Sequence, residues 1–234
     1  MKEDENENAA SYGDGCAEFY DDIYPPPHPR LISTLCELAG AGPVLELGIG
    51  TGRVALPLAA RGIKIHGVEA SQSMIAKLQE KPRATEIPMI HGDFADIRAI
   101  GSFRLIFALV NTFFLLTSRN EQRRCLKNVQ RLLSDDGIFL IEAFKPLGAA
   151  VQFENGKDGS QDIIHVLEQT IETRRGPHSY RSRICYADSQ TLDQMALDAG
   201  LRLNARWRDW QHPDLPSEND LMHISFYERL HNAL

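Results

Sequence analysis

Residues 43–52 read PVLELGIGTG, and this stretch decides the fold. The apolar residues Val44, Leu45 and Leu47 are typical of a short strand that is buried on both faces. Glycines then follow at alternate positions, and residues 51–60 have helical character. The stretch therefore predicts a strand, a glycine turn and a helix N-terminus, where the backbone can approach a ligand closely and free N–H groups point toward it.

The spacing of these glycines differs from that of a dinucleotide-binding turn. A G-x-G-x-x-G pattern would place its third glycine where Arg53 stands, whereas Gly52 comes one residue earlier. Glu46 would repel a phosphate but attract an amino group. E-x-G-x-G-x-G resembles motif I of the class I S-adenosylmethionine (SAM) methyltransferases. The resemblance implies that Gly48, Gly50 and Gly52 pack along the methionine part of SAM, with Glu46 facing its ammonium group.

Acidic residues also follow the next two expected strands, residues 63–69 and 87–91. Glu69 ends the first of them and could accept both hydroxyls of a ribose, a device that NAD and SAM sites share. The stretches E-A-S-Q-S-M and G-D-F resemble the next motifs of the same family. The resemblance implies that Asp93 bonds the adenine amino group; a turn or a helix cap is its alternative role. The cofactor-binding residues expected here are Glu69, Ala70, Met74, Asp93 and Phe94.

Residues 103–110 form a fourth expected strand, and residues 137–142 a fifth. Ligands of open α/β sheets bind at the carboxyl ends of the strands, so Asn111 and Thr112, with Val110 before them, should face the methyl donor or the acceptor. Glu142 should reach the same rim. The basic residues of the helix expected between these strands, at 118–133, are interpreted as a solvated face.

The N-terminal part divides in two. Residues 1–11 are acidic and polar, and we expect them to be disordered. Residues 12–29 contain aromatic residues near helical spacing and end in a proline-rich stop. They are expected to form either a packing helix or a lid in which Tyr20 and Tyr24 cover the cofactor.

After residue 144 the alternation of strands and helices stops. Residues 150–187 contain two strand-like runs around a turn, and we expect a small β-hairpin that covers the acceptor site. A helix at 188–199 and two strands complete the chain. The resemblance implies an α/β class, with a doubly wound, Rossmann-like, seven-stranded and mostly parallel sheet whose last strand is antiparallel. Residues 12–234 would form this single methyltransferase domain.

Composition narrows the possible partners. The net charge of −7 argues against nucleic acid and anionic membranes. The N-terminus lacks the apolar run of a signal peptide, no stretch is long enough to span a bilayer, and the four scattered cysteines suit reduced thiols. We therefore expect a cytoplasmic monomer or homodimer that takes a small-molecule acceptor and holds no metal.

The resemblance implies methyl transfer from SAM to a nitrogen or oxygen atom, with S-adenosylhomocysteine as the product. A hydroxyl acceptor needs a general base, whereas a neutral amine needs little help. The catalytic candidates are His28, His165 and Glu142. A SAM-binding module without catalysis is the first alternative, and a nicotinamide-dependent oxidoreductase is the second.

Overall fold

The structure is a computed structural model, and it describes residues 3–97, 101–146, 151–155, 162–173, 176–217 and 219–230. Within these ranges, none of the helices combines the length and the apolar character that crossing a membrane requires. All four cysteines lie in the described part of the chain and are free thiols.

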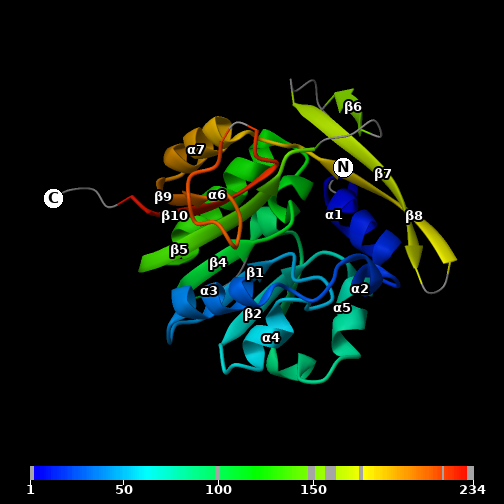
Figure 1. Cartoon of the computed structure of the whole chain (residues 1–234), viewed down its shortest axis with the longest axis horizontal. Helices are drawn as coiled ribbons and strands as arrows, with labels where there is room; N and C mark the ends of the chain where they lie inside the picture. The colour runs from blue at the N-terminus through cyan, green and yellow to red at the C-terminus, as the bar shows by residue number, and fades with distance from the viewer. Residues whose placement is uncertain are drawn as a thin grey trace.

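A central sheet of seven strands organises the molecule (Figure 1). Its strands are β1 (Val44–Leu47), β2 (Ile65–Glu69), β3 (Met89–His91), β4 (Phe103–Ala108), β5 (Leu133–Phe144), β9 (Leu201–Trp207) and β10 (Met222–Arg229). Their order is β3-β2-β1-β4-β5-β10-β9, and β1 to β5 are parallel. Because β10 pairs antiparallel with both β5 and β9, the expected doubly wound sheet with an antiparallel last strand is confirmed.

Helices cover both faces of this sheet. The helices are α3 (Pro29–Ala39), α4 (Ala55–Ala59), α5 (Gln72–Gln79), α6 (Arg119–Leu132) and α7 (Ser189–Asp198), with short 3₁₀ turns η1 (Ala84–Glu86), η2 (Phe94–Asp96) and η3 (Thr112–Leu115). Buried residues of α3 and α4 share one core with Leu105, and those of α6 and α7 share another with Ile106. Two cores on opposite faces explain why β1 is apolar on both sides, apart from Glu46.

Local signals fix where these helices begin. The Ser118 hydroxyl accepts from the Glu121 N–H, and the Glu121 carboxylate accepts from the Ser118 N–H, so α6 starts with a capping box. Ser71 caps α5 by accepting from the Met74 N–H at 3.1 Å. The caps hold the helix N-termini at the rim of the sheet.

A second sheet lies to one side of the central sheet. It contains β6 (Val151–Asn155), β7 (Ile163–Thr173) and β8 (Gly176–Ile184) in that order, all antiparallel. The cover therefore has three strands, whereas the sequence analysis expects a two-stranded hairpin. Pairing with β6 satisfies backbone groups along the edge of β7 that a hairpin alone would leave open.

The N-terminal segment lies between these two parts. Helices α1 (Glu3–Cys16) and α2 (Tyr20–Ile23) fill this place, and α1 packs against α5 and β8 (Figure 1). The disorder expected for residues 1–11 therefore differs from the structure, which continues α1 back to Glu3; residues 1–2 lie outside the described residues. Burial of Cys16 and Phe19 at the C-terminal end anchors the segment, so the helix does not depend on its polar first half.

The sheet order places a crevice between β1 and β4. Here the chain winds to β2 on one side and to β4 on the other, which is the topological switch point where ligands of such sheets bind. The glycine loop follows β1, and Val110 follows β4. The stretch that decides the fold therefore also decides the position of the site.

Candidate active site

The glycine loop after β1 is shaped by positive φ angles. Gly48 has φ +69° and Gly50 has φ +56°, a region that favours glycine. A Cβ on Gly48 would lie 2.4 Å from Thr112 Cγ2, whereas a Cβ on Gly50 would meet nothing closer than Met74 Sδ at 3.9 Å. The space beside Gly50 is therefore free of protein and available to a ligand.

Glu69 ties this loop to the start of α5. Its Oε2 accepts from the Gly50 N–H at 2.8 Å, and its Oε1 accepts from the Ser71 N–H at 2.9 Å. Burial raises the pKa of Glu69, although backbone hydrogen bonds from Ser71, Gly50 and Ala70 favour the ionised form. A carboxylate has about four lone-pair positions, so its oxygens can also accept from ligand hydroxyls.

Glu46 is the second buried carboxylate near the loop. It is 5% exposed, and burial raises its pKa well above the usual range, against the opposing charge of Arg53. Within the described residues its Oε2 has no hydrogen-bond partner. An unpartnered buried carboxylate oxygen and the open space at Gly50 fit the ammonium end and the body of SAM.

A narrow cavity of about 30 Å³ runs along the loop. Seven of the expected cofactor residues line it: Tyr20, Gly48, Gly50, Glu69, Ala70, Met74 and Phe94. Glu46, Gly52 and Asp93 are not among its lining residues. Asp93 instead accepts from the Ala95 N–H at 2.7 Å and caps η2, which is the alternative role expected for it.

A second cavity of about 980 Å³ adjoins the narrow one. The two share four lining residues, Tyr12, Tyr20, Thr112 and Leu115. Its wall contains the expected residues Tyr24, His28, Val110, Asn111 and Glu142. Much of the remaining wall is apolar or aromatic and comes from α3, β7, β8 and the loop after β9, so the cavity is assembled from distant parts of the chain.

A strained turn lines the large cavity. Val110 and Asn111 have φ angles of +51° and +62°, which a β-branched residue rarely adopts. The Val110 N–H donates to Glu142 Oε2 at 2.8 Å, and the Asn111 amide exchanges two hydrogen bonds with the backbone of Phe144. These bonds offset a strain of about 1–3 kcal/mol per residue, and strain of this kind is concentrated at functional sites.

Glu142 lies at the centre of the large cavity's polar wall. It is 4% exposed, and its Oε1 accepts from Trp210 Nε1 at 2.6 Å. Burial raises the pKa of Glu142, while the bonds from Trp210 and Val110 act in the opposite direction. Trp210 belongs to the loop between β9 and β10.

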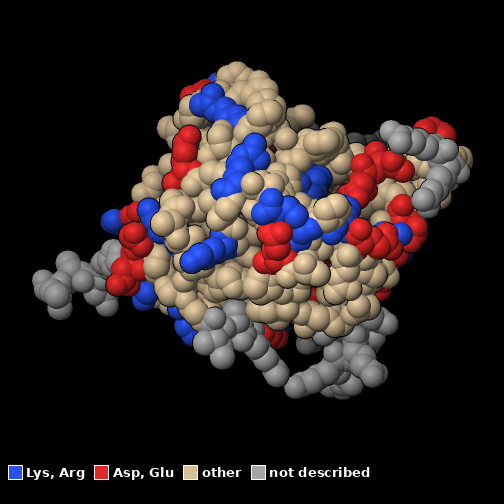
Figure 2. All heavy atoms as spheres, turned by 90° about the horizontal axis from the view of Figure 1, so that it is seen from below, with Lys and Arg blue, Asp and Glu red and all other residues tan. Residues whose placement is uncertain are grey.

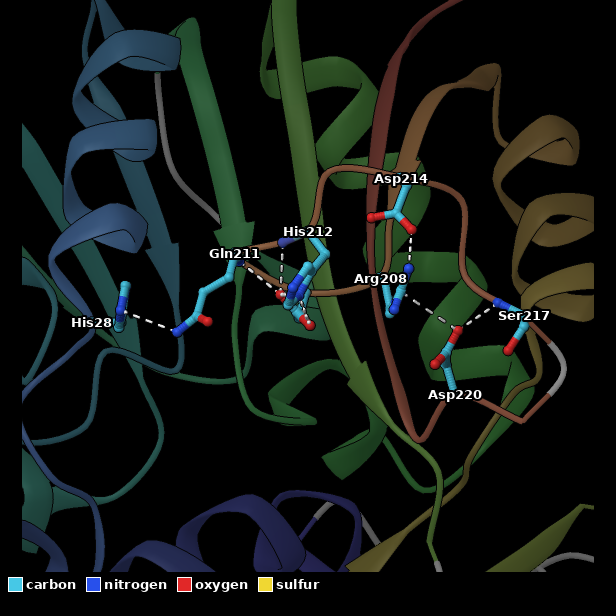
Figure 3. Close-up of polar contacts among 8 residues, drawn as sticks. His28, Arg208, Gln211, His212, Asp214, Ser217 and Asp220 are labelled. Atoms are coloured by element: carbon cyan, nitrogen blue, oxygen red, sulfur yellow. Dashed lines mark hydrogen bonds and ion pairs between the residues drawn. The ribbon is translucent and has the colours of Figure 1, made fainter.

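Polar contacts organise this loop (Figure 3). Arg208 forms ion pairs with Asp214 and Asp220, and Asp209 accepts from the backbone of Gln211 and His212. The Gln211 side chain lies 3.4 Å from His28 Nε2. The loop is therefore folded on itself and is linked to the start of α3.

The two candidate histidines differ in their positions. His28 lines the large cavity, is exposed and uses Nδ1 to accept from the Arg30 N–H at 3.2 Å, so it also caps α3. His165 is not among the lining residues; it lies beside Tyr186, with ring centroids 6.3 Å apart. Burial and the nearby Arg119 lower the pKa of His165. The structure therefore brings Glu142 and His28 to the cavity but not His165.

Sequence reasoning missed several residues of the site. Trp210, Tyr12 and Arg53 line the cavities without having been selected as site residues. A lone tryptophan in the polar run R-D-W-Q-H was the available signal for Trp210. In the described part of the chain, no group of three or more His, Cys, Asp or Glu side chains is placed to hold a metal ion.

Comparison with known proteins gives the family. Residues 44–137 match a methyltransferase domain family. An uncharacterised methyltransferase of Geobacillus kaustophilus is 36% identical over 164 residues, which cover 68% of this chain and 74% of that protein. The CcbJ methyltransferase of Streptomyces caelestis superposes with a TM-score of 0.81 at 31% identity, over 96% of this chain and all of that one.

These matches and the site geometry define the class of protein. The chain belongs to the class I SAM-dependent methyltransferases, of the small-molecule branch. The cypemycin N-terminal methyltransferase of Streptomyces sp. is 30% identical over 124 residues, or 53% of this chain and 49% of that protein. The chain spans about half the length of the first curated relatives that it matches.

Proposed function

We propose that this chain transfers the methyl group of SAM to a nitrogen or oxygen atom of a small-molecule acceptor. The carrying observation is the pair of adjoining cavities, one along the glycine loop and one of about 980 Å³ beside it. A volume of that order is typical of small-molecule sites. A methyl donor that lies along the glycine loop and extends into the second cavity would meet an acceptor there, beside the turn formed by Val110 and Asn111.

The cofactor residues take the roles that the family resemblance implies. Gly48, Gly50 and Gly52 would form the wall along the methionine part, and Glu46 would pair with its ammonium group. Glu69 would accept the ribose hydroxyls, with Ala70, Met74 and Phe94 around the nucleoside. Asp93 would reach the adenine amino group only by giving up its bond to Ala95 or by sharing it.

The protein's task in this reaction is positioning and exclusion of water. SAM supplies a methyl group that its sulfonium already activates. Tyr20 and Tyr24, with ring centroids 4.7 Å apart, would cover the donor from α2. For a hydroxyl acceptor, Glu142 or His28, which line the large cavity, would take the proton.

The proposed lid, residues 12–29, contacts both the cofactor half and the cover. Thr51 Oγ1 donates to Asp21 at 2.6 Å, and Asp21 also pairs with Lys81. On the other side Phe19 stacks on His178 of β8, with ring centroids 4.6 Å apart. Residues 150–187 would correspondingly act as the acceptor cover.

The proposed partner is a small molecule and not a nucleic acid. On the face shown in Figure 2, basic side chains form a short band flanked by acidic ones, so no broad single-sign surface lies there. The net charge of −7 points the same way. A cytoplasmic monomer or homodimer completes the proposal.

The test is incubation of the purified chain with methyl-labelled SAM and an extract of small metabolites. Label should appear in an extracted compound, together with S-adenosylhomocysteine. Binding of SAM without transfer to any fraction would favour the alternative, a SAM-binding module without catalysis. The nicotinamide-dependent oxidoreductase does not fit the family assignment.

A further inference from the structure

The Glu142 carboxylate faces the large cavity without a cation of its own. Both of its oxygens accept from neutral donors, the Trp210 indole and the Val110 amide. It forms no ion pair within the described part of the chain. A buried carboxylate without a compensating cation is costly, so a cationic group that enters the cavity would be stabilised there.

The positive charge that acts on Glu142, that of Arg53, has contacts of its own. Arg53 favours the ionised form of Glu142, but its guanidinium lies over the Tyr24 ring at 5.9 Å and donates to the Pro25 carbonyl at 3.4 Å. The other titratable groups that line the cavity are Tyr12, Tyr20, Tyr24, His28, Lys145 and Tyr180. Glu142 is therefore the one carboxylate among the described residues that line it.

Aromatic rings line the same cavity as this carboxylate. Tyr20, Tyr24, Phe144, Tyr180 and Trp210 all line the cavity. Ring faces attract cations, and the contribution is largest where water is excluded. A carboxylate within an aromatic wall is suited to a substituted ammonium group and less suited to a neutral hydroxyl or an anion.

We propose that Glu142 receives the protonated nitrogen of a basic amine acceptor, and that Trp210 is a positioning residue that holds this carboxylate toward the cavity. This inference rests on the proposed function, since it names the acceptor class of the same site. It selects nitrogen over oxygen as the atom methylated.

The proton balance supports this arrangement. Glu142 takes the proton of the ammonium group, and the freed lone pair forms the N–C bond while the C–S bond breaks, with its electron pair left on sulfur. The methylated amine carries the transferred positive charge, and Glu142 ends protonated. Burial raises the pKa of Glu142, so the carboxylate is a better base than an exposed one.

The loop between β9 and β10 supplies Trp210 at a fixed place. Its ion pairs from Arg208 to Asp214 and Asp220 close it on itself (Figure 3), and the Lys145 N–H donates to the Leu221 carbonyl at 2.7 Å. The last bond ties the end of the loop to the residue after β5, the strand that carries Glu142. The indole N–H is thereby held beside the carboxylate before any acceptor arrives.

The first experiment uses two probes of matched shape, cyclohexylamine and cyclohexanol. Their binding is measured by ligand-detected NMR with S-adenosylhomocysteine at saturation. The cation should bind about tenfold more tightly than the alcohol, as expected for a charge-assisted hydrogen bond. In Glu142→Gln the preference should disappear, with S-adenosylhomocysteine affinity unchanged by calorimetry. Equal binding of the two probes, no response to cyclohexylamine, or a preference retained in Glu142→Gln would overturn the inference.

The second experiment tests Trp210 and does not depend on Glu142→Gln being folded. Trp210→Phe keeps a ring but removes the N–H that favours the ionised carboxylate. Cyclohexylamine binding should weaken, and its loss on acidification should begin at higher pH than in the parent. Trp207→Phe is the same change at the other tryptophan. It should leave both the affinity for cyclohexylamine and its pH dependence unchanged. An unshifted pH profile in Trp210→Phe would overturn the positioning role.

The two proposals fail in different ways. If the parent protein does not bind S-adenosylhomocysteine, the proposed function fails. If it binds this product but does not distinguish the amine from the alcohol, only the amine assignment fails.

Discussion

The two cavities are built in opposite ways. At the narrow cavity, Glu69 accepts from backbone amides 2 and 19 residues away, those of Ser71 and Gly50. The large cavity relies on contacts between distant segments, since Glu142 bonds Val110 and Trp210. Much of the donor site therefore follows from the glycine loop and the ends of the next strands, whereas the acceptor site depends on contacts over longer separations.

The largest expected effect is at Gly50. Gly50→Val places a branched side chain in the open space of the narrow cavity and at a φ of +56°. We expect binding of S-adenosylhomocysteine to be lost in calorimetry while the far-ultraviolet circular dichroism stays that of a folded protein.

Gly62→Val is the matched control for this change. Gly62 has φ +83° and open space around it, so it suffers a comparable backbone strain away from the cavities. The control should lose stability but keep the parental affinity for S-adenosylhomocysteine. Parental affinity in Gly50→Val would show that the loop is only a structural turn.

Glu69→Ala should have the next largest effect. It removes a carboxylate proposed to accept the ribose hydroxyls, and hydrogen bonds to charged groups contribute about 1.5–3 kcal/mol. Affinity for S-adenosylhomocysteine should fall roughly ten- to a hundredfold. Glu86→Ala on η1 is the control. Unchanged calorimetric affinity in Glu69→Ala would remove Glu69 from the site.

Tyr20→Ala tests the proposed lid. Its ring lines both cavities, and a cation beside an aromatic face gains about 0.5–2 kcal/mol. SAM should bind about two- to thirtyfold more weakly. Asp22→Ala in the same helix is the control. In the parent, S-adenosylhomocysteine should slow hydrogen exchange in residues 12–24; identical exchange with and without it would leave α2 as a packing helix.

The smallest expected effect is on the pH dependence of thermal stability. Burial raises the pKa of Glu46 in the folded state above its unfolded value of about 4.3. This raised pKa adds stability below about pH 4.3, and the contribution is lost as the pH rises through the folded pKa. In Glu46→Gln the thermal midpoint should therefore fall less between pH 5 and 8 than in the parent.

Each 1 kcal/mol of this contribution to the free energy of unfolding shifts the thermal midpoint by about 2–4 °C for a protein of this size. Glu86→Gln changes an exposed carboxylate, so its thermal midpoint should depend on pH as that of the parent does. If the thermal midpoint of Glu46→Gln also falls with pH as steeply as that of the parent, the raised pKa of Glu46 is contradicted.

The contrast between the cavities also explains what the sequence could predict. The glycine turn, the Ser71 cap and the positions of Glu69 and Phe94 follow from residues that are neighbours in the chain. Trp210 could not be placed in this way, because its partner Glu142 is 68 residues away. His165 was selected because its segment was expected near the pocket, but its place on β7 leaves it outside the lining residues.

The strands show the same limit. Val151 and Phe153 alternate with polar residues, which is a strand signal, yet β6 was missed because pairing with β7 depends on tertiary context. The length of α1 was missed for a related reason, since polar composition alone does not reveal the buried anchor at Cys16.

The most direct test of the account is a crystal structure of the chain with S-adenosylhomocysteine. The account predicts the ribose within hydrogen-bond distance of Glu69, the amino group at Glu46, and the sulfur directed past Asn111 toward the cavity that contains Glu142. A ligand bound elsewhere, or one whose sulfur is directed away from that cavity, would contradict it.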